Sequence, residues 1–348
     1  MRALGVWTSS RLGLLLVSLM AVPWLVGGRD YLSRWKQWDA SLFVTIAQYG
    51  YRGDPAQARD PGLPAFFPGM PAVLRLVHLV VDDWALCGLL VSLVAGGVAA
   101  VALARLAEFE GGSGELAVMA MVLFPTAVFL AAGYSESLFL AFAIPSWLAA
   151  RRRQWPLAVL LAAGASAIRI TGLFLAVALI VEFALSRPRG RDLPWLVIPF
   201  VPLIAYSWYL RGLTGDWLAW KHAQEAGWGR ELVWPWRAWQ TTWDSAMTAG
   251  ESAVAFRMEI AGAVVAVAVL VWLLATRRWS EFVYCGLQAG ALLTSAYYLS
   301  VPRSLLLWFP LWVLIARLPA RWIIGYGLLL GPLMVLNALR FLTGAWAG

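Results

Sequence analysis

The sequence predicts an all-α polytopic membrane protein with about 11 transmembrane helices. The composition gives the first indication, because 61% of the residues are hydrophobic and only 13% are charged. Soluble domains carry roughly one-quarter charged residues. The second indication is segment length, because most of the chain falls into apolar runs of about 17 to 25 residues, which cross a bilayer as helices. We therefore interpret residues 1–348 as one integral membrane domain.

Eleven apolar runs lie between charged or Pro/Gly-rich breaks, and we expect each run to form a span. They cover residues 12–28, 84–106, 115–132, 136–150, 155–170, 172–186, 193–213, 256–276, 281–299, 304–317 and 322–342. The first run has the length of a signal peptide, but Pro23-Trp24-Leu25 is a poor cleavage site, so we count it as a span.

Basic residues in alternate short loops predict the orientation, because Lys and Arg collect on the cytoplasmic side of short loops. These residues are Arg2, Arg11, Arg151, Arg152, Arg153, Arg187, Arg189, Arg191, Arg277, Arg278, Arg317 and Arg321. The N-terminus is then cytoplasmic and the C-terminus external, in a multi-pass protein of the inner (plasma) membrane. The net charge of +8 follows from this topology and from anionic lipids, and it does not indicate a nucleic-acid partner.

Two long segments, residues 29–83 and 214–255, then lie on the external face. Each contains apolar residues at helical spacing, which predicts amphipathic helices in the membrane interface. The first stripe is Tyr31, Trp35, Trp38, Leu42 and Ile46, and the second is Trp236, Trp239, Trp243 and Met247. Two interpretations stay open: the helices are only anchors, or they cover a cavity that opens to the bilayer.

The remaining polar residues gather on the same predicted face, and ionisable groups near membrane depth are functional candidates by default. The candidates are Asp39, Trp38, Tyr134, Ser135, Glu136, Arg169, Lys221, His222, Gln224, Arg230 and Arg303. Each also has a structural interpretation. Arg169 and Arg303 could be snorkelling side chains, although the two together favour a phosphate ligand. Glu136 could cap the next helix, and a lone His222 could make an ordinary hydrogen bond.

Several site classes are not indicated. Cys87 and Cys285 both lie in apolar runs, and the two histidines, His78 and His222, are in separate segments, so neither a disulfide framework nor a metal cluster is expected. Glycine-rich phosphate loops are absent from the sequence. We therefore expect no cofactor, no divalent metal and no soluble nucleotide substrate.

Several motifs follow one another along the chain: Trp38-Asp39-Ala40, Ile46-Ala47, Gly50-Tyr51, Phe66-Phe67-Pro68, Pro71, Arg75, Phe124-Pro125-Thr126-Ala127, Gly133 to Phe139, Arg169, Thr171-Gly172, Gly215-Asp216, Gln224, Trp228-Gly229-Arg230, Arg303 and Phe309-Pro310. In this order they resemble the PIG-V family of mannosyltransferases within the GT-C superfamily, including its bacterial (actinobacterial) members, and the resemblance implies a GT-C-type fold. The blocks extend over nearly the whole chain. The sequence departs from the family pattern at two places, with Gly69-Met70 in place of a larger aromatic pair and Ile170 in place of proline. These departures bear on the subgroup of the family and on the acceptor more than on the class of enzyme.

The resemblance implies a polyprenyl-phosphate mannose donor, a lipid-linked glycan or glycolipid acceptor, and inverting α-mannosyl transfer on the external face. Asp39 would be the general base, because a hydroxyl acceptor needs a group to take its proton. Arg303 and Arg169, with His222 or Arg230, would bind the donor phosphate. Trp38, Tyr134, Ser135, Glu136, Gln224 and Lys221 would contact sugar or acceptor hydroxyls.

Two other classes of function are compatible with a membrane-embedded polar site. A lipid or lipid-linked-sugar transporter (flippase) would need polar groups through the full membrane depth, whereas Glu182 is the one acidic exception in the cytoplasmic halves of the spans. A non-catalytic scaffold subunit would need only the amphipathic anchors. The sequence leaves open the acceptor, its linkage position, the identity of the sugar and the oligomeric state.

Overall fold

The computed structural model describes residues 2–26, 31–186 and 190–348, and in this part of the chain the secondary structure is helical, without strands. Five helical segments are long and apolar enough to cross a membrane: Arg2–Leu25, Trp84–Phe109, Gly190–Thr214, Ser252–Ala275 and Ala320–Leu342. The predicted class, an all-α polytopic membrane protein, is confirmed. The eleven-span topology and its orientation stay predictions, and two of its basic residues, Arg187 and Arg189, lie outside the described residues.

Eight of the expected spans coincide with single α-helices. These helices are α1 (Arg2–Val26), α4 (Trp84–Phe109), α6 (Glu136–Arg151), α7 (Trp155–Ile168), α8 (Thr171–Leu185), α12 (Glu251–Ala275), α13 (Trp279–Leu293) and α16 (Ala320–Leu342). The expected first span extends to residue 28, and its last two residues lie outside the described part.

The other three expected spans are each divided into two helical pieces. The pieces are α5 (Gly114–Val122) with η4 (Ala127–Leu130), η5 (Gly190–Phe200) with α9 (Val201–Thr214), and α14 (Val301–Leu305) with α15 (Phe309–Ile315). Pro125, Pro202 and Pro310 lie at these junctions. Proline lacks the backbone N–H that a continuing helix needs and clashes with the preceding turn, so each run changes its helical path there.

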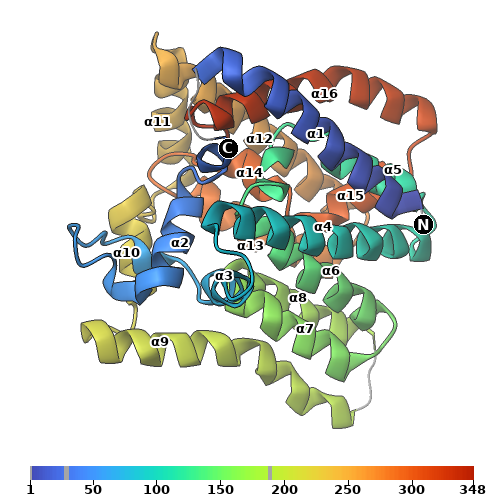
Figure 1. The fold of residues 1–348 in the computed structure, drawn as a ribbon. Coiled ribbons are helices and arrows are strands. Elements are labelled where there is room, and N and C mark those ends of the chain that lie inside the picture. The colour runs from blue at the N-terminus through green and yellow to red at the C-terminus, as the bar shows by residue number, and fades with distance from the viewer. Residues whose placement is uncertain (1, 27–30, 187–189) are drawn as a thin grey trace. The chain divides into compact units, whose positions relative to one another are not determined.

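The chain divides into two compact units. Unit 1 contains Met1–Gln48, Met70–Leu148 and Leu306–Ala347, and unit 2 contains Tyr49–Gly69 and Ala149–Leu305. In unit 1, α1 packs against α4, α5 and α16 (Figure 1). A Cβ added to Gly96 of α4 would lie 2.2 Å from the ring of Trp7, so glycine permits this close approach of α1 and α4. The Trp7 indole donates to the Leu93 carbonyl at 3.1 Å.

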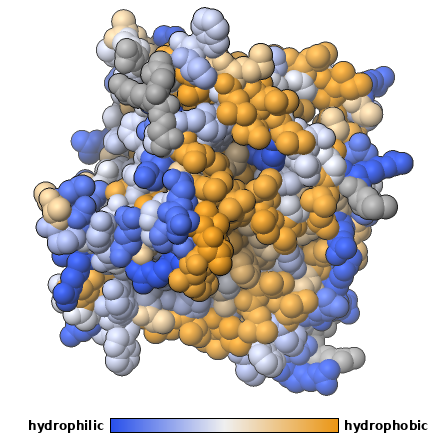
Figure 2. Space-filling model, viewed as in Figure 1, coloured by the Kyte–Doolittle hydropathy of each residue, from blue (hydrophilic) through white to orange (hydrophobic). Residues whose placement is uncertain are grey.

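The outer surface of α1 and α16 is apolar. Its exposed side chains include Leu12, Leu16, Met20, Leu328 and Leu329. Figure 2 shows apolar atoms gathered over these helices. A soluble protein rarely exposes so many large aliphatic side chains on adjacent helices, and hydrocarbon is the solvent that suits them.

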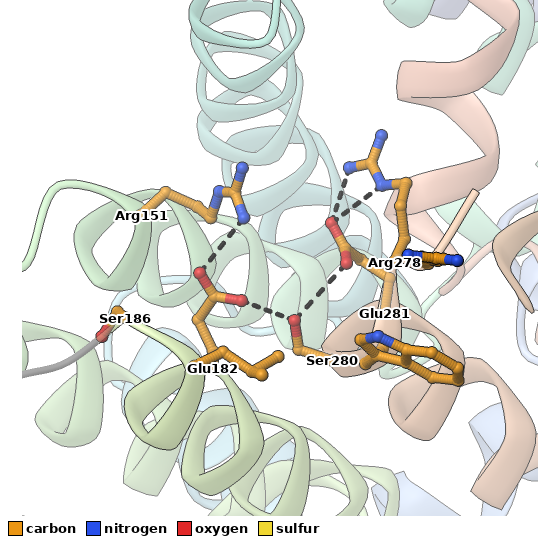
Figure 3. A pocket seen from close by; sticks show the side chains of 9 residues that line it. Arg151, Glu182, Ser186, Arg278, Ser280 and Glu281 are labelled. Carbon is orange, nitrogen blue, oxygen red and sulfur yellow. Dashed lines mark hydrogen bonds and ion pairs between the residues drawn. The ribbon is translucent and has the colours of Figure 1, made fainter.

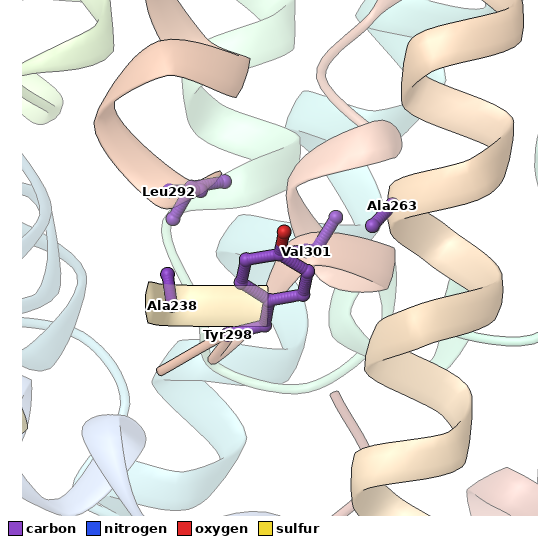
Figure 4. Close-up of a cluster of buried hydrophobic side chains, with 5 residues drawn as sticks. All are labelled: Ala238, Ala263, Leu292, Tyr298 and Val301. Atoms are coloured by element: carbon purple, nitrogen blue, oxygen red, sulfur yellow. The ribbon is translucent and has the colours of Figure 1, made fainter. Parts of the chain in front are cut away.

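In unit 2, α8 packs against α7 and α13, while α12 packs against α11 (Pro235–Met247), α13 and α14. A buried apolar cluster joins these last four helices and the turn before α14 (Figure 4). Its members are Ala238, Ala263, Leu292, Tyr298 and Val301. This cluster fixes the place of α14 in unit 2.

In the first of the two long segments, the one helix expected to carry the stripe from Tyr31 to Ile46 is divided. The segment forms η1 (Leu32–Trp35), α2 (Asp39–Tyr49), η2 (Gly50–Arg52), η3 (Leu63–Ala65) and α3 (Gly69–His78). The apolar stripe from Tyr31 to Ile46 is therefore interrupted, and the single-helix prediction is wrong. Trp38 has a φ of 53°, a left-handed conformation that ends helical continuity. Trp35 is buried, whereas Trp38 is 45% exposed.

The second long segment agrees with the prediction. It contains α10 (Ala219–Trp228) and α11, and the expected aromatic stripe of α11 is exposed. The stripe is Trp236, Trp239, Trp243 and Met247, opposite buried Ala238, Thr242 and Ala246. A helix with an exposed aromatic face is suited to the membrane interface, where amphipathic rings are favoured.

We predict that Asn337→Leu destabilises unit 1. The Asn337 amide donates to the carbonyls of Pro125 at 3.1 Å and Ala347 at 2.5 Å. Leucine would leave both carbonyls without this donor, at a cost of about 1–3 kcal/mol for each buried group. Thermal unfolding in detergent should show a lowered midpoint, whereas Leu336→Met, an exposed change on the same helix, should leave it unchanged. Equal midpoints for both variants would contradict this role of Asn337.

Candidate active site

Asp39 is the first residue of α2 and is half-buried. The preceding turn is closed by two backbone hydrogen bonds, from the Ala40 N–H to the Gln37 carbonyl at 3.1 Å and from the Ser41 N–H to the Trp38 carbonyl at 3.0 Å. The backbone thus holds Asp39 at a fixed position at the start of α2.

Side chains from distant parts of unit 1 hold this turn in place. The Tyr134 hydroxyl donates to the Gln37 carbonyl at 3.0 Å. The Trp38 and Trp346 rings meet edge to face with centroids 5.5 Å apart, and Trp35 packs against Phe341 at 6.5 Å. Sequence reasoning missed Phe341 and Trp346, because nothing in the local pattern connects the C-terminal residues with the segment that carries Asp39.

A narrow cavity of about 10 Å³ lies beside α2 in unit 1. Its lining includes Trp35, Lys36, Ala40, Trp84 and Gly133. A cavity of this size holds about one water molecule. It can therefore solvate the start of α2, but it cannot hold a sugar ring.

The turn from Gly133 to Ser137 is buried inside unit 1, with Tyr134, Ser135 and Glu136 fully covered. The Tyr134 ring packs against Phe129 and Phe341, with centroid distances of 4.9 and 5.8 Å. Glu136 is the first residue of α6. Through Tyr134, this turn holds the backbone just before Asp39 in place. Contact of the turn with a sugar stays a prediction.

Arg303 lies in α14 of unit 2 and is only 5% exposed, so it does not snorkel to the surface. The turn before α14 is attached to α12 by Glu259, whose carboxylate accepts the N–H groups of Ser300 at 2.7 Å and Val301 at 2.8 Å. Ser300 is in the left-handed region, with φ at 64°. A Cβ added to Gly262 would lie 2.9 Å from Pro302. Glu259 and Gly262 together therefore determine where Arg303 sits.

Glu259 was absent from the sequence-based candidates, although a carboxylate inside an apolar run was a signal that could have found it. It is 2% exposed. Arg230 lies within electrostatic reach of Glu259, and its guanidinium donates to the Leu299 carbonyl at 3.5 Å. Arg230 and Glu259 thus meet at the same turn, residues 299–301. This contact gives Arg230 a positioning role beside the predicted role in phosphate binding.

Arg169 is half-buried and lies at the junction of two helices, after the last residue of α7 and just before Thr171, which begins α8. It is within electrostatic reach of Tyr284, a buried residue of α13. Arg169 therefore lies at a helix junction and Arg303 lies within the short helix α14, both in unit 2.

The remaining candidates lie on α10. Lys221 and His222 are exposed, and Gln224 is half-buried. His222 Nδ1 is 2.6 Å from Asp216 Oδ2, and this hydrogen bond, with one from the Leu218 N–H, lowers the pKa of the Asp216 carboxyl. Lys221 forms an ion pair with Glu225 at 3.1 Å. The ordinary structural interpretation of His222 therefore has direct support.

The helix α10 packs onto the first long segment within unit 2. The Trp228 and Phe66 rings meet with centroids 5.4 Å apart. The backbone of Phe66 is held in turn, because its carbonyl accepts the hydroxyls of Tyr51 at 2.7 Å and Tyr206 at 3.1 Å. Burial raises the pKa of the Tyr51 hydroxyl, which keeps it protonated as a donor. Among the described residues, no three His, Cys, Asp or Glu side chains are placed to share a metal ion.

A comparison with protein families gives one match. The model of the family described as Mannosyltransferase (PIG-V) matches residues 16–186. This region includes Asp39, the turn from Gly133 to Ser137, and Arg169. No curated protein and no solved structure is similar enough to the chain to count as a match. This match assigns residues 16–186, just under half of the chain, to the PIG-V mannosyltransferase family.

Proposed function

We propose that the protein transfers a mannosyl residue from polyprenyl-phosphate mannose to a lipid-linked glycan or glycolipid acceptor, with inversion at the anomeric carbon. The observation that carries the proposal is the placement of Asp39, a carboxylate fixed at a helix start within the family-matched region. The alternating basic loops support a reaction on the external face of the plasma membrane.

In the proposed reaction, an acceptor hydroxyl attacks the anomeric carbon from the side opposite the phosphate. The new glycosidic bond forms while the bond to the phosphate oxygen breaks, and the polyprenyl phosphate leaves with that electron pair. Asp39 takes the hydroxyl proton, because a carboxylate within about 3 Å of a hydroxyl can act as its general base. A β-linked donor thereby gives an α-mannoside.

Arg303 and Arg169 are the proposed ligands of the donor phosphate. The burial of Arg303 supports this assignment, because a guanidinium shielded from water binds an anion more strongly than an exposed one. Its fixed position also supports it, since charge that is held in place before the reaction stabilises the leaving group without reorganisation. His222 and Arg230 are secondary candidates, since each already holds a neighbouring backbone segment or side chain.

The residues proposed to contact the sugar and the acceptor form an accessible group and a buried group. Trp38, beside Asp39, is exposed and can stack against a sugar ring, and Lys221 and Gln224 are accessible on α10. Tyr134, Ser135 and Glu136 are covered, so we assign them an indirect role in which they hold the Asp39 segment. No metal ion or cofactor is needed by this scheme.

We predict that Asp39→Asn lowers turnover by about 100-fold or more, because asparagine keeps the shape of the side chain and removes the proton acceptor. Transfer of labelled mannose in detergent gives the rate, and the affinity for the donor should change little. Asp82→Asn, an exposed change in the same long segment, should keep wild-type turnover. Wild-type turnover by folded Asp39→Asn would remove Asp39 from the role of base.

We predict that Arg303→Gln weakens donor binding by roughly 10- to 100-fold, the range expected for loss of charge-assisted hydrogen bonds to phosphate. Titration with the donor lipid, or the KM of the donor, measures the effect. Arg321→Gln, an exposed arginine on the predicted opposite side, provides the control. An unchanged donor affinity in Arg303→Gln would rule out this phosphate ligand.

We predict that Glu259→Gln acts through Arg303. The amide can still accept hydrogen bonds through one oxygen, so the turn at Ser300 loosens and the KM of the donor rises. The effects of Glu259→Gln and Arg303→Gln should be less than additive in the double variant, because both disturb one interaction. Full additivity would show that Glu259 stabilises the protein without positioning Arg303.

A further inference from the structure

Unit 2 contains a second polar site, in a cavity of about 280 Å³ (Figure 3). The end of α6, the end of α8 and the start of α13 surround it. Its lining includes Arg151, Glu182, Leu185, Arg277, Arg278 and Ser280. Neither the family match nor the proposed transfer reaction assigns a role to this cavity.

The cavity is separate from the proposed phosphate ligand Arg169. Arg169 precedes the first residue of α8, whereas Glu182 and Leu185 lie in its last turn. The helix Thr171–Leu185 has 15 residues and is therefore about 22 Å long. The basic loops beside the cavity are those that the charge pattern places on the cytoplasmic side.

Two carboxylates in the cavity are already neutralised by arginines. Arg151 Nη1 donates to Glu182 Oε1 at 3.1 Å, and the Ser280 hydroxyl donates to Glu182 Oε2 at 2.5 Å. Arg278 donates to Glu281 Oε1 through Nε at 3.1 Å and Nη2 at 2.6 Å. These contacts account for both negative charges of the lining.

Arg277 supplies a third guanidinium, which gives the lining an excess of one positive charge. Among the residues that the structure describes, its side chain has no hydrogen bond or ion pair. The N-terminus of α13 adds to the positive potential, because Arg278 at its N-cap makes no side-chain capping bond and the first-turn N–H groups carry partial positive charge. The cavity is therefore electrostatically suited to an anion.

Two exposed apolar side chains in the lining favour a lipid over a free anion as the ligand. Leu185 is 56% exposed and Trp279 is 43% exposed, and both line the cavity. An amphipathic ligand can place a charged group beside Arg277 and an acyl chain along these side chains. The cytoplasmic leaflet is also the leaflet that is rich in anionic lipids.

We propose that this cavity binds the phosphate headgroup of an anionic glycerophospholipid, with Arg277 as the principal phosphate ligand. Arg151 and Arg278 keep their carboxylate partners and define the walls of the site. The bound lipid ties the ends of α6, α8 and α13 together at the predicted cytoplasmic surface. This site is independent of mannosyl transfer.

The test measures thermal unfolding of the purified full chain in detergent during titration with dioctanoylphosphatidylglycerol. We expect a saturable rise of the midpoint that dioctanoylphosphatidylcholine does not reproduce. Arg277→Gln should weaken the apparent affinity about tenfold, whereas Arg277→Lys should retain most of it because the charge remains. Arg321→Gln, another exposed arginine of the predicted cytoplasmic side, is the matched control and should behave as wild type.

Three results would overturn the proposal. Equal protection by the anionic and zwitterionic lipids would remove the electrostatic site. Equal protection by glycerol phosphate would show that a soluble phosphate, and not a lipid, is the ligand. Unchanged affinity in folded Arg277→Gln would exclude Arg277 as the phosphate ligand. Because the readout is unfolding, the outcome does not depend on whether Asp39 and Arg303 have their proposed roles.

Discussion

Peptide groups at helix breaks have to find hydrogen-bond partners inside the protein, because hydrocarbon supplies none. At several helix breaks in this chain, the backbone groups bond to side chains from elsewhere in the same unit. Asn337 of α16 donates to the Pro125 carbonyl between α5 and η4. The Trp312 indole donates to the Leu306 carbonyl at 3.1 Å, between α14 and α15. Glu259 accepts the two N–H groups that precede α14. These contacts make irregular backbone tolerable where water is scarce.

The candidate catalytic residues lie beside such breaks. The hydrogen bonds that satisfy a break also make the backbone there rigid, so a nearby side chain is held in a defined position. Asp39 follows the left-handed Trp38, in a turn that Tyr134 holds through the Gln37 carbonyl. Arg303 follows the left-handed Ser300, in a turn that Glu259 holds. In both places a distant side chain bonds to the backbone just before the functional residue. The supporting contact therefore fixes the backbone beside the functional residue.

Sequence reasoning found the features that depend on side-chain periodicity. It located the helical runs, the exposed aromatic face of α11 and the carboxylate Asp39 at the start of its segment. It missed the break at Trp38, because apolar spacing does not report φ, and it missed the division of residues 304–317 into α14 and α15. Glu259 and Phe341 were also missed, since their roles arise from contacts between residues far apart in the chain. The burial of Tyr134 depends on the same tertiary packing.

Glu182 and Glu259, two buried acidic residues in apolar helices, bear on the choice between a transferase and a transporter. A translocation path needs charged groups that can change partners as a substrate passes. Glu259 instead has both oxygens bonded to backbone N–H groups, which cannot move away without unfolding the turn. Glu182 has one oxygen on Arg151 and the other on Ser280. Fixed partners of this kind suit a catalyst, because a transferase gains most when its charges are already in place as the transition state forms.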